Sequence, residues 1–183
     1  MIVPAILVVT GASGVGKTAL VHALEAQAKP GVRCYYFDSV GVPSLSEMMA
    51  DYGSPQAWQV ATTHQWIATL ATNRHACRVA VLEGQVRPSV VQQAFEEHQV
   101  RLGRVVLVEC EPATRDARLP TPQQQSELAA QQMAAWAAYL RGQADALQLP
   151  VLDTTTVTLE AGVRLLAAHV EALEQASAAL GPT

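Results

Sequence analysis

Charged residues are scarce in this 183-residue chain. They make up 15% of it, against 50% hydrophobic residues, and 12 basic side chains stand against 16 acidic ones for a net charge of −4. Only two of the basic residues are lysines, Lys17 and Lys29, and the arginines form neither a run nor a stripe. Because a nucleic-acid-binding protein needs a concentrated basic surface, we expect no nucleic acid as a partner. The composition is that of a globular protein.

Closely spaced cysteines and long apolar runs are also missing. The three cysteines are odd in number and far apart, without the spacing of metal sites or redox pairs, so we expect reduced core thiols at Cys34, Cys77 and Cys110. The apolar run near the N-terminus ends at Gly11 after about nine residues, too short for a membrane span or for the full pattern of a signal peptide. These features predict a cytoplasmic protein that does not enter a membrane.

Short β-branched runs alternate with longer segments rich in alanine and glutamine. This alternation is typical of βα units around a parallel sheet with helices on both faces. The predicted strands are 6–10, 32–37, 78–82, 105–109 and 150–152. The main predicted helices begin at Lys17 and otherwise span 55–73, 88–101, 122–147 and 158–179, and capping-box patterns stand at 44–47 and 121–124. No linker or repeat interrupts the pattern, so residues 1–183 are predicted to form one three-layer α/β/α domain.

The segment after the first strand carries the strongest motif. Gly11 to Thr18 matches G-x-x-x-x-G-K-[ST] and stands between a predicted strand and a predicted helix. Its glycines let the backbone turn N–H groups inward, and the helix adds its positive dipole end, which together form a cradle for a polyphosphate. Lys17 is expected to reach the β- and γ-phosphates of ATP, and the Thr18 hydroxyl to bind Mg²⁺. A glycine-rich turn with an incidental lysine is the disfavoured alternative, because the full pattern is rare by chance. The residues predicted to contact the nucleotide here are Gly11, Ala12, Ser13, Gly14, Val15, Gly16, Lys17, Thr18 and Ala19.

Two further predicted strands are followed by acidic residues, at the sheet edge where open α/β folds bind ligands. Glu83 is a candidate to hold Mg²⁺ through water or to polarise a nucleophile near the γ-phosphate; the alternative is a helix-capping or solvated glutamate. Asp38 is a candidate to orient or deprotonate an acceptor hydroxyl; the alternative is an Asx-turn that opens the next loop. Both are therefore candidate catalytic residues.

Three arginines are candidates for binding phosphate. Arg87 stands four residues after Glu83 in the same loop, and a guanidinium there is placed to clamp a phosphate. Arg115 and Arg118 lie one helical turn apart and would share a helix face, which suits two arginines closing over a transferring phosphoryl group. An ordinary solvated helix face would show the same pair, so both interpretations stay open.

The tryptophans and histidines receive no catalytic role. Trp58, Trp66 and Trp136 lie in predicted helices among alanines and are interpreted as core or groove-lining residues. The histidines show no metal-ligand spacing with one another or with the cysteines, so no metal site is assigned to His22, His64, His75, His98 or His169.

On these residues, the chain resembles the small P-loop kinases, the group that contains nucleoside monophosphate kinases, shikimate kinase and gluconate kinase. Glu83 and Gly84 match the Asp-Gly of the group's third-strand motif, and Arg87 falls on the arginine that binds the acceptor phosphate. The resemblance implies a P-loop NTPase fold with a five-stranded parallel sheet in the order 2-3-1-4-5. It also implies that Gly84 and Arg87 bind the acceptor, and Asp38, already a candidate for orienting the acceptor hydroxyl, is predicted to bind it with them.

Two further features follow from this resemblance. A short lid is implied at about 112–125, and Arg115 and Arg118 would belong to it and contact the nucleotide phosphates. The loop 153–156, after the last strand, would pack around the nucleotide base, which makes Thr154 a further nucleotide-binding candidate.

The sequence therefore predicts an ATP- and Mg²⁺-dependent phosphotransferase that moves the γ-phosphoryl group to a small-molecule acceptor: a nucleotide, a nucleoside or a sugar-like compound. Its partners would be a nucleoside triphosphate and that acceptor, and its state a monomer or homodimer. The alternative is a nucleotide-binding regulatory module, or a slow NTPase coupled to a partner. An enclosed polar pocket opposite the γ-phosphate would favour the kinase, and an open shallow surface the module.

Overall fold

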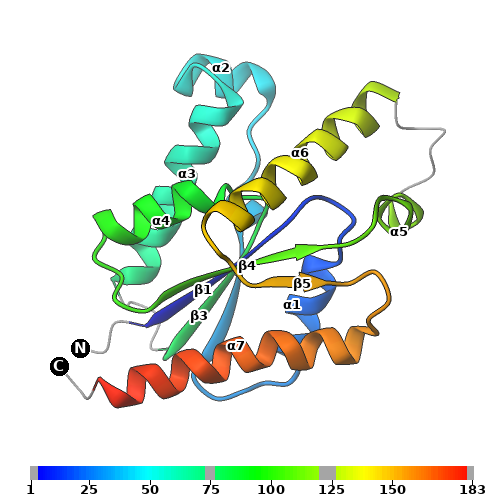
Figure 1. Ribbon diagram of the computed structural model, residues 1–183. Coiled ribbons are helices and arrows are strands. Elements are labelled where there is room, and N and C mark those ends of the chain that lie inside the picture. Colours follow the sequence, from blue (N-terminus) through cyan, green and yellow to red (C-terminus); the bar gives the residue numbers. More distant parts are fainter. Residues whose placement is uncertain (1–3, 73–76, 120–126, 181–183) are drawn as a thin grey trace.

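A parallel sheet lies at the centre of the computed structural model, which describes residues 4–72, 77–119 and 127–180 (Figure 1). Neighbouring strands all pair in parallel, in the order β2-β3-β1-β4-β5. The predicted five-stranded sheet and its strand order are thus confirmed. The strands are β1 (Ala5–Thr10), β2 (Val32–Tyr36), β3 (Val79–Glu83), β4 (Gly103–Glu109) and β5 (Val151–Asp153).

Helices cover both faces of the sheet, which gives the predicted three layers (Figure 1). On one face, α1 (Lys17–Ala26) packs against α7 (Leu159–Ala179). The other face carries α3 (Pro55–Ala71), α4 (Pro88–Glu97) and α6 (Glu127–Ala146), and α2 (Leu45–Tyr52) packs on α3. Two short helices complete the described chain, the 3₁₀ helix η1 (Phe37–Val40) after β2 and α5 (Pro112–Arg118) after β4.

Successive residues of β1 face opposite layers, as the pleat of a strand requires. Leu7 and Val9 pack in the core beneath α1 and α7, whereas Ile6 and Val8 pack in the core beneath α3 and α4. Every residue of β1 is buried. Because both faces are covered, the strand is a continuous apolar run in the sequence rather than an alternating one.

A few elements end at other residues than predicted. β2 stops at Tyr36, because the chain turns into η1 at Phe37. α4 ends at Glu97 rather than at residue 101, because Gln99 takes a positive φ of 53° that a helix cannot continue through. α2 begins at the first predicted capping box, where Ser44 and Glu47 bond each other's backbone N–H groups. The second predicted capping box, at 121–124, lies outside the described residues.

The carboxyl ends of the first three strands lie level with one another. Val9 of β1 and Tyr36 of β2 both pair with Glu83, the last residue of β3. The loops that follow these strands therefore meet at one edge of the sheet, which is where ligands bind in open α/β folds.

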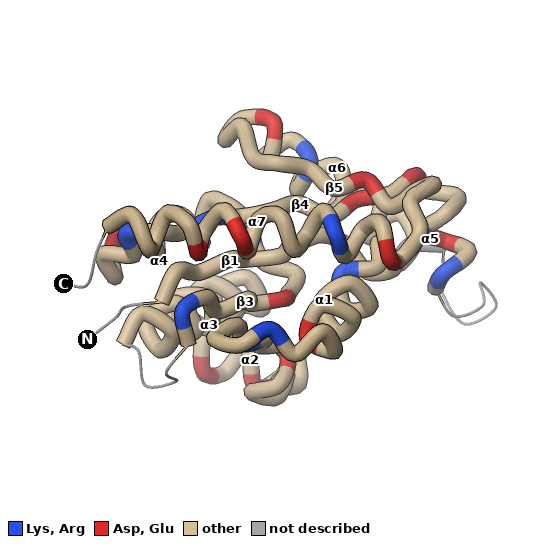
Figure 2. The backbone as a smooth tube through the Cα atoms, turned by 90° about the horizontal axis from the view of Figure 1, so that it is seen from below, with Lys and Arg blue, Asp and Glu red and all other residues tan. Residues whose placement is uncertain are grey.

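Charge is spread thinly over the rest of the molecule. Among the described residues, lysine and arginine positions are interspersed with acidic ones along the tube of Figure 2. Two ion pairs among the described residues tie α7 to its neighbours, Lys29 with Glu171 and Arg78 with Glu174. None of the described helices has the length and apolar character needed to cross a membrane.

Candidate active site

The loop between β1 and α1, the predicted phosphate cradle, turns at glycines with positive φ. Gly16 precedes α1 in the left-handed conformation, with φ 96°, and Gly14 has φ 81°. Gly11 must lack a side chain because a Cβ there would lie 2.2 Å from the carbonyl oxygen of Val108 in β4. The loop is thus held directly against the sheet, while the first N–H groups of α1 remain available to an anion.

Lys17, the first residue of α1, is buried beside Glu83. Only 5% of Lys17 and 9% of Glu83 is exposed. The Lys17 Nζ donates to the backbone oxygen of Ala12 across the loop (2.9 Å) and lies 3.7 Å from Glu83 Oε1. Burial lowers the pKa of Lys17, and the charge of Glu83 opposes that shift. The loop therefore holds a desolvated ammonium group, whose attraction for a phosphate is stronger than it would be in water.

Oxygen ligands for a cation meet at the start of α1. Burial raises the pKa of Glu83, while the nearby Lys17 charge and a hydrogen bond with the exposed Thr18 side chain lower it. Mg²⁺ takes hydroxyl, carboxylate and water oxygens as ligands, so these two side chains fit the ion that the sequence assigns to them. A poorly solvated carboxylate also gains from a cation beside it.

Asp38 reaches the same sheet edge from the side of β2. It lies in η1 rather than directly after a strand, and its exposed side chain lines a cavity. The N–H of Gly41 donates to the backbone oxygen of Asp38 (3.0 Å), so this turn is closed by the main chain rather than by the alternative Asx-turn. Burial dominates the pKa of Lys17 and of Glu83, and the charge of Asp38 is a smaller influence that raises both. The charge of Asp38 therefore acts on both Lys17 and Glu83.

Gly84 brings η1 into contact with the loop after β3. A Cβ at Gly84 would lie 2.5 Å from the Cβ of Phe37, the first residue of η1. The Gly84 N–H also donates to the backbone oxygen of Val9 (3.1 Å), which fixes the loop to β1. Asp38 and Gly84, which were both predicted to bind the acceptor, thus come from two loops that touch.

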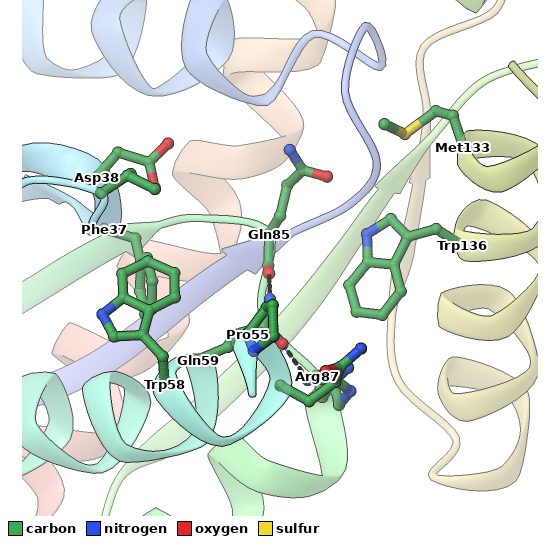
Figure 3. Close-up of a pocket in the computed structure, with 11 residues that line it drawn as sticks. Phe37, Asp38, Pro55, Trp58, Gln59, Gln85, Arg87, Met133 and Trp136 are labelled. Carbon is green, nitrogen blue, oxygen red and sulfur yellow. Dashed lines mark hydrogen bonds between the residues drawn. The ribbon is translucent and has the colours of Figure 1, made fainter. Parts of the chain in front are cut away.

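A cavity of about 430 Å³ opens between η1, the N-terminal end of α3 and the first half of α6 (Figure 3). Arg87 forms part of its wall, donates to Gln59 Oε1 and holds its guanidinium 5.2 Å from the ring centre of Trp136. Asp38 and Arg87 thus share one cavity, as predicted for an acceptor site. The described residues that line it are Phe37, Asp38, Val42, Pro55, Gln56, Trp58, Gln59, Gln85, Arg87, Met133 and Trp136.

Two glutamines that the sequence interpretation missed connect the cavity to the phosphate loop. Gln85 donates from Nε2 to the Ser13 hydroxyl (2.9 Å), and its backbone oxygen accepts from Gln59 Nε2 (2.7 Å). A signal for Gln59 was present, because Pro55, Trp58 and Gln59 share a helix face at spacings of three and four residues. No comparable pattern marks Gln85.

The tryptophans divide as groove-lining and packing residues, in line with the interpretation from sequence. Trp58 and Trp136 line the cavity, and the Trp58 ring also packs edge-on against Phe37 at 5.9 Å between ring centres. Trp66 instead donates from its indole N–H to the backbone oxygen of Phe37 (3.2 Å).

Arg115 and Arg118 lie against the phosphate loop. Arg115 is 5% exposed, pairs with Asp116 and packs where a Cβ on Gly14 would meet it. Arg118 donates to the hydroxyl and the backbone oxygen of Thr154, both at 2.9 Å, and to the backbone oxygen of Val15 at 3.4 Å. The two guanidinium groups are therefore engaged in different contacts, and their contact with a transferring phosphoryl group stays a prediction. Residues 120–125 of the predicted lid lie outside the described residues.

Thr154 supports the phosphate loop from beneath. This buried residue donates from its hydroxyl to the backbone oxygen of Val15 (2.7 Å), and its N–H bonds to the backbone oxygen of Glu109. The loop after β5 thus contacts the nucleotide cradle through Thr154, and its contact with a base stays a prediction.

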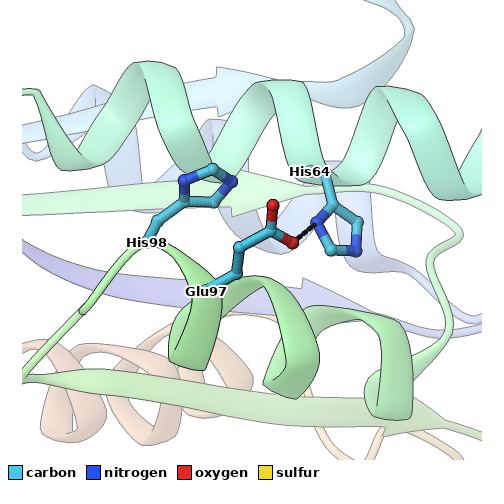
Figure 4. A group of neighbouring side chains, drawn as sticks. All are labelled: His64, Glu97 and His98. Atoms are coloured by element: carbon cyan, nitrogen blue, oxygen red, sulfur yellow. Dashed lines mark ion pairs between the residues drawn. The ribbon is translucent and has the colours of Figure 1, made fainter.

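The described chain also brings together one cluster that the histidine spacing did not indicate. His64 of α3 and Glu97 and His98 at the end of α4 place one ligand atom each within 4.8 Å of the others (Figure 4). His64 Nδ1 lies 2.8 Å from Glu97 Oε2, which is an ion pair when the imidazole is protonated. The sequence interpretation, which found no metal-like grouping of histidines, missed this neighbourhood because the contact is tertiary.

Similarity to known proteins is found at the level of the fold. No protein-family model matches the chain, and neither does any curated protein sequence. Among solved structures, a gluconokinase from Sinorhizobium meliloti 1021 is similar over 100% of both chains, with a TM-score of 0.65 and 18% identity. The chain has the fold of the small P-loop kinases.

Two further structures share this small P-loop kinase fold. A shikimate kinase from Acinetobacter baumannii, in complex with shikimate, is 11% identical, with a TM-score of 0.63 over 93% of this chain and 95% of that one. A tunicamycin resistance protein from Deinococcus radiodurans is 15% identical, with a TM-score of 0.62 over 91% of this chain and 95% of that one. Proteins with different names and acceptors thus have the same architecture, so the fold does not identify the acceptor.

Proposed function

We propose that this protein is an ATP- and Mg²⁺-dependent kinase that transfers the γ-phosphoryl group of ATP to a hydroxyl of a small molecule. One observation carries the proposal. A phosphate cradle with a buried lysine stands next to a separate cavity that contains an exposed carboxylate and an arginine. A kinase needs these two neighbouring sites, whereas a nucleotide-binding module needs only the first. The cavity is partly open and more apolar than polar, unlike the enclosed polar pocket expected from the sequence for a kinase, so the pairing of the two sites supports the proposal and the enclosure of the second does not. The likeness in fold to a gluconokinase and a shikimate kinase supports the same conclusion.

Each residue has a role that follows from its position. The cradle and Lys17 bind the β- and γ-phosphates, and Thr18 and Glu83 would hold Mg²⁺. The metal ion, when bound, neutralises charge that develops on the phosphate oxygens. Arg118 and Thr154 keep the cradle in shape through Val15.

Transfer requires an acceptor hydroxyl close to Asp38. The hydroxyl oxygen forms a bond with the γ-phosphorus, the bond from that phosphorus to the β–γ bridging oxygen breaks, and ADP leaves with the bonding electrons. Asp38 accepts the hydroxyl proton and, being exposed, releases it to water. Arg87 orients the acceptor from the opposite wall of the cavity.

ADP release measured with and without a panel of sugars, sugar acids, nucleosides and nucleotides tests this proposal, with mass spectrometry of the products. We expect at least one acceptor to accelerate ADP release and to gain a phosphoryl group. Lys17→Ala should reduce the rate by about 10²–10³-fold, because it removes a charge aimed at the transferring group.

The other lysine of the chain provides the matched control. Lys29 lies beyond the far end of α1 and pairs with Glu171, so Lys29→Ala should keep full activity. ATP hydrolysis that no acceptor stimulates would instead support the regulatory module or slow NTPase. Full activity of the Lys17→Ala variant would overturn the proposal. The cytoplasmic location, the monomeric or homodimeric state and the extent of the lid stay predictions from the sequence.

A further inference from the structure

Apolar side chains make up much of the acceptor cavity. Phe37, Val42, Pro55, Trp58, Met133 and Trp136 all line it. They come from three separate elements, η1 with its following loop, α3 and α6, and Figure 3 shows Trp58 and Trp136 on opposite sides of the space. A cavity of about 430 Å³ is within the range of small-molecule sites. An acceptor that fills it therefore places much of its surface against carbon atoms.

Charge in the same cavity is sparse and balanced. Asp38 is the one acidic and Arg87 the one basic residue among the described residues that line it. Arg87 is already engaged by the Gln59 side chain and by the Trp136 ring.

These observations disfavour an acceptor that carries strong negative charge. A phosphate or carboxylate bound here would have one partly engaged guanidinium as its cation and the Asp38 carboxylate as a neighbour. Moving such a group out of water costs free energy unless charged donors replace its hydration. The cost is smaller for an uncharged molecule, and an apolar ring gains free energy from packing against the indole rings of Trp58 and Trp136.

We infer that the acceptor is an uncharged alcohol with an apolar ring system, bound with its ring between Trp58 and Trp136 and its hydroxyl at Asp38. The inference rests on the proposed kinase function and narrows it. Gln56, Gln59 and Gln85 supply neutral hydrogen-bonding groups for further hydroxyl or carbonyl oxygens of the ring compound.

Matched acceptor pairs test the two parts of this inference separately. The effect of charge is tested by comparing a nucleoside with its 5′-monophosphate, and shikimate methyl ester with shikimate. The effect of the apolar ring is tested by comparing a 4-nitrophenyl glycoside with the free sugar. We expect kcat/KM to be about tenfold or more higher for the uncharged member and for the aryl member, which corresponds to about 1.4 kcal/mol or more. Preference for the anionic member of both charge pairs, or for the free sugar, would overturn the inference and leave the kinase proposal standing. If no compound accelerates ADP release, the kinase proposal itself fails.

A charge added to the cavity wall provides the second test. Gln56 is exposed at the start of α3 and lines the cavity, whereas Gln65 is exposed on the same helix and does not line it. Gln56→Arg should lower the preference for uncharged acceptors by about 3- to 10-fold, because it supplies a second guanidinium to an anion. Gln65→Arg should leave the preference unchanged. If both variants and the wild type prefer uncharged acceptors to the same degree, the residues of this cavity do not discriminate between acceptors by charge.

Discussion

The phosphate cradle and the acceptor cavity share one edge of the sheet, yet they are built differently. The cradle is a short continuous segment pressed onto β4, and its buried lysine lies beside the buried Glu83 of β3. The cavity is assembled from η1, α3, α6 and the loop after β3, and two of its polar residues, Asp38 and Gln56, are exposed. The comparison indicates that the cradle has little freedom to change, whereas the cavity wall can vary without loss of the fold. Acceptor choice can therefore differ among proteins that share this architecture.

The largest effect is expected on stability, when a glycine of the cradle and a glycine beside the cavity are each replaced by alanine. Gly11→Ala in the cradle forces a Cβ to within 2.2 Å of the Val108 carbonyl, so unfolding free energy should fall by about 4 kcal/mol or more. Gly41, next to the cavity, also has a positive φ, but no atom lies within 4 Å of the place that a Cβ would take, so Gly41→Ala should cost about 1–3 kcal/mol. Urea unfolding measures both. Equal losses of unfolding free energy in the two variants would contradict the conclusion that the cradle has less freedom to change than the cavity wall.

Removal of the buried Lys17 ammonium should make the unfolding free energy depend more strongly on pH. In Lys17→Met, the pKa of Glu83 loses the cation that opposes burial, so it should rise further above its ordinary value of 4.5. A raised folded-state pKa gives full stability below 4.5 and a loss as pH rises through the folded pKa. We expect unfolding free energy to fall as pH rises above 4.5, over a wider pH range than in the wild type and by up to about 1.4 kcal/mol per pH unit.

Two further variants locate the origin of this pH effect. Adding Glu83→Gln to Lys17→Met should remove the new slope, because the titrating carboxyl is gone. Arg87→Met in the cavity should create no such slope, because its hydrogen-bond partner, Gln59, is neutral. A slope that persists in the double variant would show that Glu83 is not the group that titrates.

The smallest effect is expected at the connection between the two regions. Gln85→Ala removes the hydrogen bond to Ser13 but no charge, so KM for the acceptor and for ATP should each rise by about 3- to 10-fold. Gln93 is exposed on α4, and Gln93→Ala serves as the control with no change expected. A rise in only one of the two constants would mean that Gln85 serves a single site instead of joining both.

The difference between the cradle and the cavity also explains which features could be predicted from the sequence. The cradle lies within one stretch of chain between a buried strand and a helix, so its motif, its lysine and its flanking elements were all predictable, and the strand order followed from the resemblance. The Arg87–Trp136 contact joins residues from two distant elements, and the Gln85–Ser13 bond spans 72 positions. Such pairings depend on how helices pack, which periodicity does not encode. Arg118 illustrates the limit: its helical position was predictable, but its bonds to Thr154 were not.

The absent side chain at residue 84 has a consequence for the distance over which a phosphoryl group would travel. Because η1 rests directly on Gly84, the thickness of that contact determines how far Asp38 stands from the cradle. A methyl group there would act as a spacer between donor and acceptor, and in-line transfer is sensitive to displacements of about 1 Å. The size of residue 84 thus sets the gap that the reacting atoms must close.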